Sequence, residues 1–192
     1  ILQAHPLIAD NPILFVVREQ YRSDHHNTAT LFQMGEINTG SFRGGAALKT
    51  LDGKTGQVRT LLETATGVIR DPEVYFDGSR IIFSMRRDIR DDYHIYEINA
   101  DGSGLKQLTF MEDADDLDPI YMPDGSIVFS STRDPKYIPC QRHLMANLFK
   151  MNGDGSNIHQ LGFNTQFEGR ASLMPDGRLL YTRWEYVDKH YS

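Results

Sequence analysis

A turn followed by a strand recurs along this chain, and this repeat constrains the fold more than any other feature. It occurs as FDGSRIIFSMRR at 76–87, MPDGSIVFSSTRD at 122–134 and MPDGRLLYTR at 174–183. The turn residues Asp77, Asp124 and Asp176 are 47 and 52 residues apart. Periods of this size are typical of solenoids, propellers and repeat arrays.

A second repeat is interleaved with the first. IYEINADGSGLKQLTF (95–110) aligns without gaps on LFKMNGDGSNIHQLGF (148–163), and LKTLDGKTGQVRTLL (48–62) is a more diverged copy. Each copy is an alternating segment, a turn containing Asp-Gly, and another short alternating segment, which is typical of a β-hairpin. The two repeats together give four antiparallel strands with a period of 45–50 residues, the pattern of a β-propeller blade.

The sequence therefore predicts an all-β protein, a β-propeller of four-stranded antiparallel blades. The second blade is expected to hold strands at 71–76, 80–86, 94–100 and 105–110. ILFVVR (13–18) and LLYTRW (179–184) both align with its second strand. The predicted blades, all within one domain over 1–192, are 11–63, 71–110, 118–163 and a partial blade at 168–192.

About three blades and part of a fourth make an incomplete ring, because propellers close with 4–8 blades. The remainder of the propeller is therefore expected outside this chain, as a partner of the open edge. The competing fold is a β-sandwich in which the turns are similar by chance.

Composition excludes several classes of function. The chain has 26 acidic and 20 basic residues and a net charge of −6, which argues against nucleic acid as a partner. No apolar run approaches the ~20 residues of a membrane span. The single cysteine, Cys140, excludes an internal disulfide framework and a multi-cysteine zinc site.

The repeats resemble a known group of proteins. The Pro-Asp-Gly turn before IVFSS and the NADGSG…QLT hairpin resemble the repeats of TolB-type propellers. RDPEVYFDGSRIIFSMRRD, NLFKMNGDGSN and LMPDGRLLYTRWEY are similar to the propeller of the hydrazine synthase alpha subunit and its bacterial relatives. That family works with covalently attached c-type haem, but this chain has no Cys-x-x-Cys-His, so the haem is not carried over. The resemblance implies a periplasmic or secreted bacterial protein.

Four polar loops follow the predicted second strands, and each opens with Arg and reaches a His. These candidate ligand-binding residues are Arg18 and His25, Arg87 and His94, Arg133 and His143, and Arg183 and His190. In a propeller such loops share one rim with the connections between blades, which here include EDADDLD (112–118). Convergent polar groups at a concave opening are the default position of a ligand site. The acidic run itself is interpreted as a solvated loop.

The chemistry of these loops leaves alternatives open. His with Asp suits a divalent metal, for which His25 and His94 are the candidates, whereas Arg suits the carboxylates of an acidic sugar or peptide. The plainer interpretation is that each Arg and His caps its own strand end. Trp184 is expected to pack between blades, with a sugar-stacking platform as its alternative.

Two classes of function follow. The first is an extracytoplasmic TolB-like module that binds a polysaccharide or protein partner at the loop face. The second is an enzyme, either a metal-assisted lyase or hydrolase acting on an acidic polysaccharide, or a haem-linked redox enzyme. No Gly-x-Ser-x-Gly, His-Glu-x-x-His or Gly-x-Gly-x-x-Gly occurs in the sequence.

Overall fold

A computed structural model describes residues 5, 10–19, 42–137 and 144–185. These residues form thirteen β-strands and no helix. The strands are β1 (Ile13–Arg18), β2 (Ala46–Leu51), β3 (Val58–Thr64), β4 (Val68–Val74), β5 (Arg80–Arg86), β6 (His94–Asn99), β7 (Lys106–Gln107), β8 (Asp116–Tyr121), β9 (Ile127–Ser131), β10 (Asn147–Met151), β11 (His159–Gln160), β12 (Phe167–Leu173) and β13 (Leu179–Trp184).

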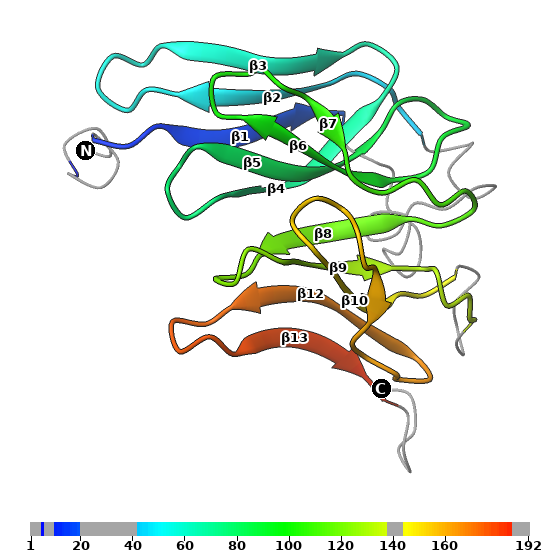
Figure 1. Cartoon of the computed structure of the whole chain (residues 1–192). Coiled ribbons are helices and arrows are strands. Elements are labelled where there is room, and N and C mark those ends of the chain that lie inside the picture. The colour runs from blue at the N-terminus through cyan, green and yellow to red at the C-terminus, as the bar shows by residue number, and fades with distance from the viewer. Residues whose placement is uncertain (1–4, 6–9, 20–41, 138–143, 186–192) are drawn as a thin grey trace.

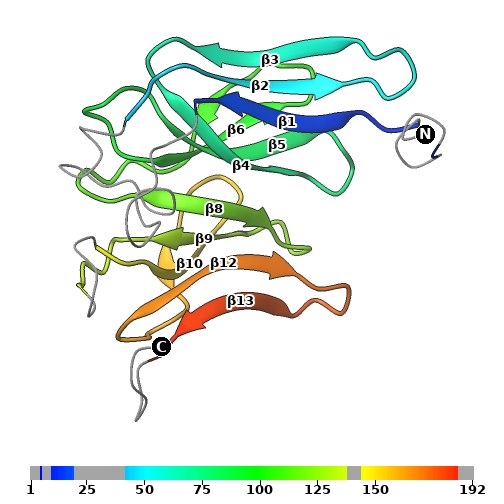
Figure 2. The same ribbon diagram turned by 180° about the vertical axis from the view of Figure 1, so that it is seen from behind.

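The strands build four antiparallel sheets that follow one another in chain order (Figure 1). The first sheet has the order β1-β2-β3, the second β4-β5-β6-β7, the third β8-β9-β10-β11, and the last holds β12 and β13. Figure 2 shows the same succession from behind. The predicted fold class is confirmed: the sheets are blades of a propeller and form an incomplete ring. The extent of the domain, 1–192, stays a prediction.

The hydrophobic core lies between neighbouring sheets. Successive side chains of a strand point to opposite faces, so a strand buried on both faces contributes to two clusters. In β5, Phe83 packs in the cluster shared with the first sheet, around Leu48, while Ile82 packs in the cluster shared with the third, around Phe129. Burying such a side chain contributes about 1.5–3 kcal/mol, so inter-sheet packing orders the blades.

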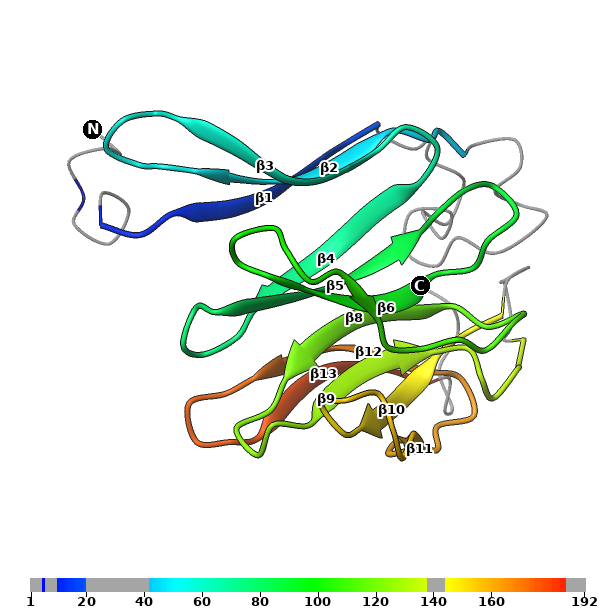
Figure 3. The ribbon, with the colours of Figure 1, turned by 45° about the horizontal axis from the view of Figure 1, so that its top comes forward.

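The hairpin turns lie on one face of the molecule, and the connection between β5 and β6 at 87–93 lies on the other (Figure 3). Ala100 N donates to Ser79 O at 2.9 Å, which joins the two turns of the second sheet, and Lys150 Nζ lies 2.9 Å from Asp124 in the third. Figure 3 shows the turns of the sheets pointing to the same side. The predicted placement of the Asp-Gly turns on one face is confirmed.

Two sets of strand bounds were predicted wrongly. The inner strand expected at 71–76 is β4 (Val68–Val74): it begins earlier because Val68, Ile69 and Arg70 already pair with β5, before the β-bulge at Asp71. The outer strand expected at 105–110 has only two residues, Lys106 and Gln107. Beyond them Leu108 N still donates to Ile95 O at 2.8 Å, so contact continues outside regular pairing.

Within the described residues, no helix has the length and apolar character needed to cross a membrane.

Candidate ligand-binding site

The predicted site residues divide into those the structure describes and those it does not. His25, His143 and His190 lie outside the described residues, as does Cys140. His94 and the four arginines are described, so the second blade is the place where a predicted Arg and His can be examined together. The joint convergence of all four loops stays a prediction.

His94 is the first residue of β6, paired with Met85 of β5, and its side chain is 7% exposed. Its Nε2 lies 3.8 Å from Asp91 Oδ1. Its Nδ1 is buried and has no hydrogen-bond partner in the described part of the chain. A buried polar atom without a partner costs about 1–3 kcal/mol. His94 is therefore a buried imidazole whose Nδ1 position makes no hydrogen bond to the described residues.

The loop before β6 is closed by Arg87 and Asp91. The main-chain N–H and the Nε of Arg87 each donate to Asp91 Oδ2 at 2.9 Å. Burial raises the pKa of Asp91, but the hydrogen bonds from Arg87 outweigh burial, so its pKa is lower than that of a free carboxyl. Arg87 therefore organises its own loop, as the plainer interpretation of these arginines expected.

The connection between the second and third sheets adds carboxylates beside this loop. Asp92 Oδ2 accepts the main-chain N–H of Asp113 at 2.8 Å, which ties the connection to the loop. Burial raises the pKa of Asp92 above its usual value and outweighs the hydrogen bond from the Asp113 main chain and the charges of His94 and Arg86, which lower it. Asp92 therefore lies where its negative charge is under-compensated.

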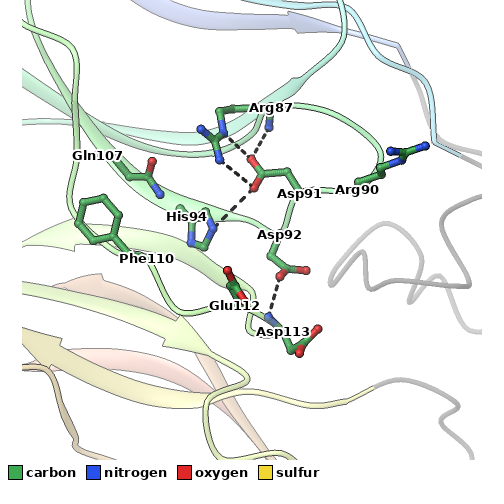
Figure 4. Close-up of a pocket in the computed structure, with 9 residues that line it drawn as sticks. All are labelled: Arg87, Arg90, Asp91, Asp92, His94, Gln107, Phe110, Glu112 and Asp113. Atoms are coloured by element: carbon green, nitrogen blue, oxygen red, sulfur yellow. Dashed lines mark hydrogen bonds and ion pairs between the residues drawn. The ribbon is translucent and has the colours of Figure 1, made fainter.

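These groups enclose a polar cavity of about 500 Å³ on the loop face (Figure 4). Its lining residues are Arg87, Arg90, Asp91, Asp92, His94, Gln107, Phe110, Glu112 and Asp113. In Figure 4 one ring nitrogen of His94 points toward Asp91, and Phe110 and Glu112 both approach from the connection that follows β7. The arrangement offers acceptors, donors and one aromatic face to a ligand.

Gln107 and Phe110 were missed from the sequence. Their signal was the gapless repeat, in which they correspond to Gln160 and Phe163 of the next blade. Phe110 is 67% exposed and Phe163 is 76% exposed. A large apolar residue kept exposed at the same place in two blades indicates a surface that contacts something other than the blade itself.

Arg133 and Arg183 lie away from this cavity, in ion pairs with acidic residues of the inner strands. Arg133 Nη2 is 2.7 Å from Asp116 Oδ2, and Arg183 Nη1 is 3.3 Å from Glu168 Oε1. Arg18 borders another depression, between β1 and β3. A ligand-binding role for these three arginines stays a prediction.

The acidic run 112–118 is the solvated loop expected from its charge only at its start, where Glu112 and Asp113 are exposed. Asp115 is 4% exposed and Asp116 is fully buried. Asp116 is held by Arg133 and by Ser131 Oγ, which donates at 2.6 Å. Asp115 Oδ1 accepts the N–H of Tyr93 at 3.0 Å. Asp115 and Asp116 are buried because their carboxylates satisfy a loop amide and an arginine that the fold brings to the inner strand.

Two further expectations concern Trp184 and a metal. Trp184 packs against a cluster that includes Leu117 and Phe167, so its predicted packing role is confirmed. Within residues 42–137 and 144–185, no three His, Cys, Asp or Glu side chains are grouped as metal ligands. A divalent metal shared by His25 and His94 stays a prediction, because His25 is outside the described residues.

Comparison with known proteins supports the fold. Neither a protein-family model nor a curated protein matches the sequence. Hydrazine synthase from Kuenenia stuttgartiensis is similar in structure, with a TM-score of 0.67 and 20% identity over 88% of this chain and 27% of its own. TolB from Acinetobacter baumannii has a TM-score of 0.56 and 18% identity over 72% of this chain and 32% of its own.

A putative TolB from Agrobacterium tumefaciens has a TM-score of 0.58 and 20% identity, covering 71% of this chain and 45% of its own. The chain thus spans less than half the length of each of these structures. At such identities the similarity establishes a β-propeller fold of the TolB and hydrazine synthase type, and function must be argued from the site.

Proposed function

Because the chain shares its fold with TolB and hydrazine synthase propellers, we propose that it is part of an extracytoplasmic TolB-like module that binds a ligand or partner at its loop face. The binding position is the cavity around His94. The observation that carries this proposal is the Nδ1 of His94, which is buried and has no hydrogen-bond partner among the described residues.

Burying Nδ1 of His94 without a hydrogen bond costs free energy. Most buried polar groups in proteins are hydrogen-bonded, and an exception needs an explanation. His94 is one of the residues that line the cavity, so a ligand bound there lies beside the imidazole ring. A ligand that supplies the missing bond recovers free energy that the folded protein alone forgoes. Charged groups in the same cavity can orient a ligand, and the exposed phenyl ring of Phe110 can contact its apolar part.

The test is an NMR titration that follows the imidazole carbon–hydrogen signals of the protein. Probes from three classes are added separately: neutral oligosaccharides, oligogalacturonate, and short peptides of defined charge. His159, which lies on β11 outside the cavity and bonds Asn157 O through Nδ1, gives the internal reference signal. His94→Asn identifies the His94 signal, because that signal is lost in the variant; asparagine is chosen because it occupies the equivalent position of the next blade, Asn147.

At least one probe class is expected to shift the His94 signal while the His159 signal stays unchanged. His94→Asn should weaken that binding and leave the fold intact, as judged by circular dichroism. If no class shifts His94, or if every probe shifts His94 and His159 alike, the cavity is not a ligand site and the proposal is wrong.

A further inference from the structure

The charges of the cavity around His94 are unbalanced, and the imbalance indicates what it binds. The lining has four carboxylates, Asp91, Asp92, Glu112 and Asp113, and two guanidinium groups. Asp91 is neutralised by Arg87 at 2.9 Å. The remaining three carboxylates have no ion pair with a cationic side chain in the part of the chain that the structure describes.

Arg90 does not correct this imbalance. Its main-chain N–H donates to Asp88 Oδ1 at 2.7 Å, which fixes the backbone of the loop tip. Figure 4 shows its guanidinium directed away from the His94 ring and from Glu112. Asp92, Glu112 and Asp113 therefore face the cavity without an ion pair among the described residues, and for Asp92 the charges of Arg86 and His94 offset only part of the cost of burial. Charge of one sign in a cleft selects ligands of the other sign.

His94 presents an acceptor to the same space. The Asp91 carboxylate lies 3.8 Å from Nε2, which favours the tautomer that carries its proton on Nε2. Nδ1 then holds a lone pair and accepts a hydrogen bond. Since Nδ1 is the unpartnered atom, the cavity lacks a donor at this point. An ammonium or guanidinium group supplies donors and brings no acceptor of its own.

Phe110 completes the arrangement with an aromatic face. Phe110 is 67% exposed at the edge of the cavity. It follows the end of β7, where Gln107 Nε2 donates to Thr109 O at 2.8 Å. The face of a phenyl ring attracts an organic cation, with a contribution of about 0.5–1 kcal/mol at an exposed position. The aliphatic part of a Lys or Arg side chain also packs on such a ring.

From this combination we infer that the cavity receives an organic cation, the ammonium or guanidinium group of a Lys- or Arg-bearing polypeptide segment. Asp92, Glu112 and Asp113 bind the charge, His94 Nδ1 accepts one of its hydrogen bonds, and Phe110 covers its aliphatic stem. This inference rests on the proposed binding function and narrows it to one class of ligand. Oligogalacturonate and other acidic polymers are disfavoured here, because like charges oppose their entry.

The experiment compares four tripeptides: triarginine, trilysine, triglycine and triglutamate. Each is titrated at low ionic strength, with the His94 imidazole signals followed by NMR and dissociation constants measured by calorimetry. Triarginine and trilysine are expected to shift His94 and to bind more weakly as salt is added, since exposed charges are screened. Triglycine and triglutamate should leave the signal unchanged.

Matched variants separate a site from general attraction to an acidic protein. Glu112→Gln and Asp113→Asn each remove one cavity charge and should weaken triarginine binding about two- to fivefold, the range for an exposed charge pair. Glu63→Gln removes the same charge from an exposed residue of β3 outside this cavity and should leave the affinity unchanged.

The outcomes distinguish failure of the organic-cation inference from failure of the proposed binding function. A His94 shift caused by triglutamate, or by a neutral or acidic saccharide but no cationic peptide, overturns the cation inference and keeps the cavity as a binding site. Equal losses in Glu63→Gln and Glu112→Gln also overturn it. Absence of any His94 shift with every probe overturns the proposed function itself.

Discussion

At the scale of single residues, Asp115 shows how the fold changes the chemistry of a side chain. It is 4% exposed, its Oδ1 accepts the N–H of Tyr93, and its own N–H donates to Thr132 Oγ1 at 2.9 Å. Burial, helped by the neighbouring carboxylates Asp92 and Asp116, raises the pKa of Asp115 to about 7. It does so despite the hydrogen bond from Tyr93 and the charge of Arg86, which lower the pKa. Loop closure at the binding face therefore depends on a carboxyl that titrates near neutral pH.

This pKa predicts a pH dependence of stability. The folded protein binds the Asp115 proton more tightly than the unfolded chain, whose aspartate pKa is about 3.9. The resulting stabilisation is present below about pH 4 and is lost as the pH rises toward the folded pKa of about 7. Asp115→Asn keeps an acceptor for Tyr93 and removes the titration. Between pH 4 and 7 the free energy of unfolding of the parent should therefore fall by up to about 4 kcal/mol more than that of Asp115→Asn.

Urea unfolding at several pH values between 4 and 7 measures this difference. Asp115→Ala serves as the comparison, because it also removes the titration but leaves the Tyr93 N–H without its acceptor. It should be less stable than Asp115→Asn at every pH. Parallel pH profiles for the parent and Asp115→Asn would contradict the prediction.

At the scale of elements, the same irregularity recurs in each inner strand. β4, β8 and β12 all carry a register shift against the next strand. The residue at the shift has a positive φ in each case: 52° at Asp71, 52° at Asp118 and 55° at Arg170. A positive φ costs energy for a residue with a side chain, so its repetition indicates that the bulge is part of the blade design.

The hairpin turns set the spacing between blades. Gly155 follows β10 at φ +90°, and a Cβ built on it would lie 2.5 Å from the main-chain oxygen of Leu108 in the preceding blade. Gly102 occupies the same position one blade earlier and approaches Leu61 O in the same way. By contrast, Gly125 has φ +81°, but no atom lies within 4 Å of the position that a Cβ would take there. Gly155 and Gly125 thus share a left-handed backbone conformation and differ in inter-blade contact.

Substituting alanine at the two glycines separates these effects. Gly125→Ala should lower the free energy of unfolding by about 1–2 kcal/mol, the cost of a left-handed backbone conformation for an L-residue. Gly155→Ala should cost a further 1–3 kcal/mol or so, because its methyl group forces neighbouring blades apart. Urea unfolding of both variants gives the comparison. Equal losses would show that the turn does not control blade spacing.

At the scale of the whole molecule, the succession of sheets leaves a strand edge uncovered. Among the described residues β13 pairs only with β12, and its Leu180 is 63% exposed. An unpaired edge offers N–H and C=O groups to another strand and promotes association. The 192-residue chain on its own is therefore expected to self-associate through β13.

A charge placed on this edge should reduce the association. Leu180→Lys adds a positive charge to β13, and edge lysines are a common protection against strand pairing. Phe76→Lys is the control, because Phe76 is 60% exposed but lies in the turn between β4 and β5. Sedimentation velocity should show less self-association for Leu180→Lys than for the parent or for Phe76→Lys. A parent chain that stays monomeric at every concentration would contradict the prediction.

Much of the architecture could be predicted from the sequence because its signals are local. The Asp-Gly turns are stabilised by hydrogen bonds between residues close in sequence. Asp77, Asp101 and Asp154 each accept the N–H of the serine two residues further along the chain. Alternation then assigns each strand a face, and the repeat of these units gives the order of the blades. His94 and Arg87 were identified on the same basis, from their position after a recognisable strand.

What only the tertiary structure decided is the environment of each polar group. Arg87 and Arg133 look alike in sequence, yet one holds a nearby loop carboxylate and the other a fully buried aspartate on the adjacent inner strand. Asp113 and Asp115 belong to one acidic run, yet only Asp115 is buried. Desolvation and ion pairing depend on which neighbours the fold brings within a few ångströms, and residues distant along the chain supply those neighbours.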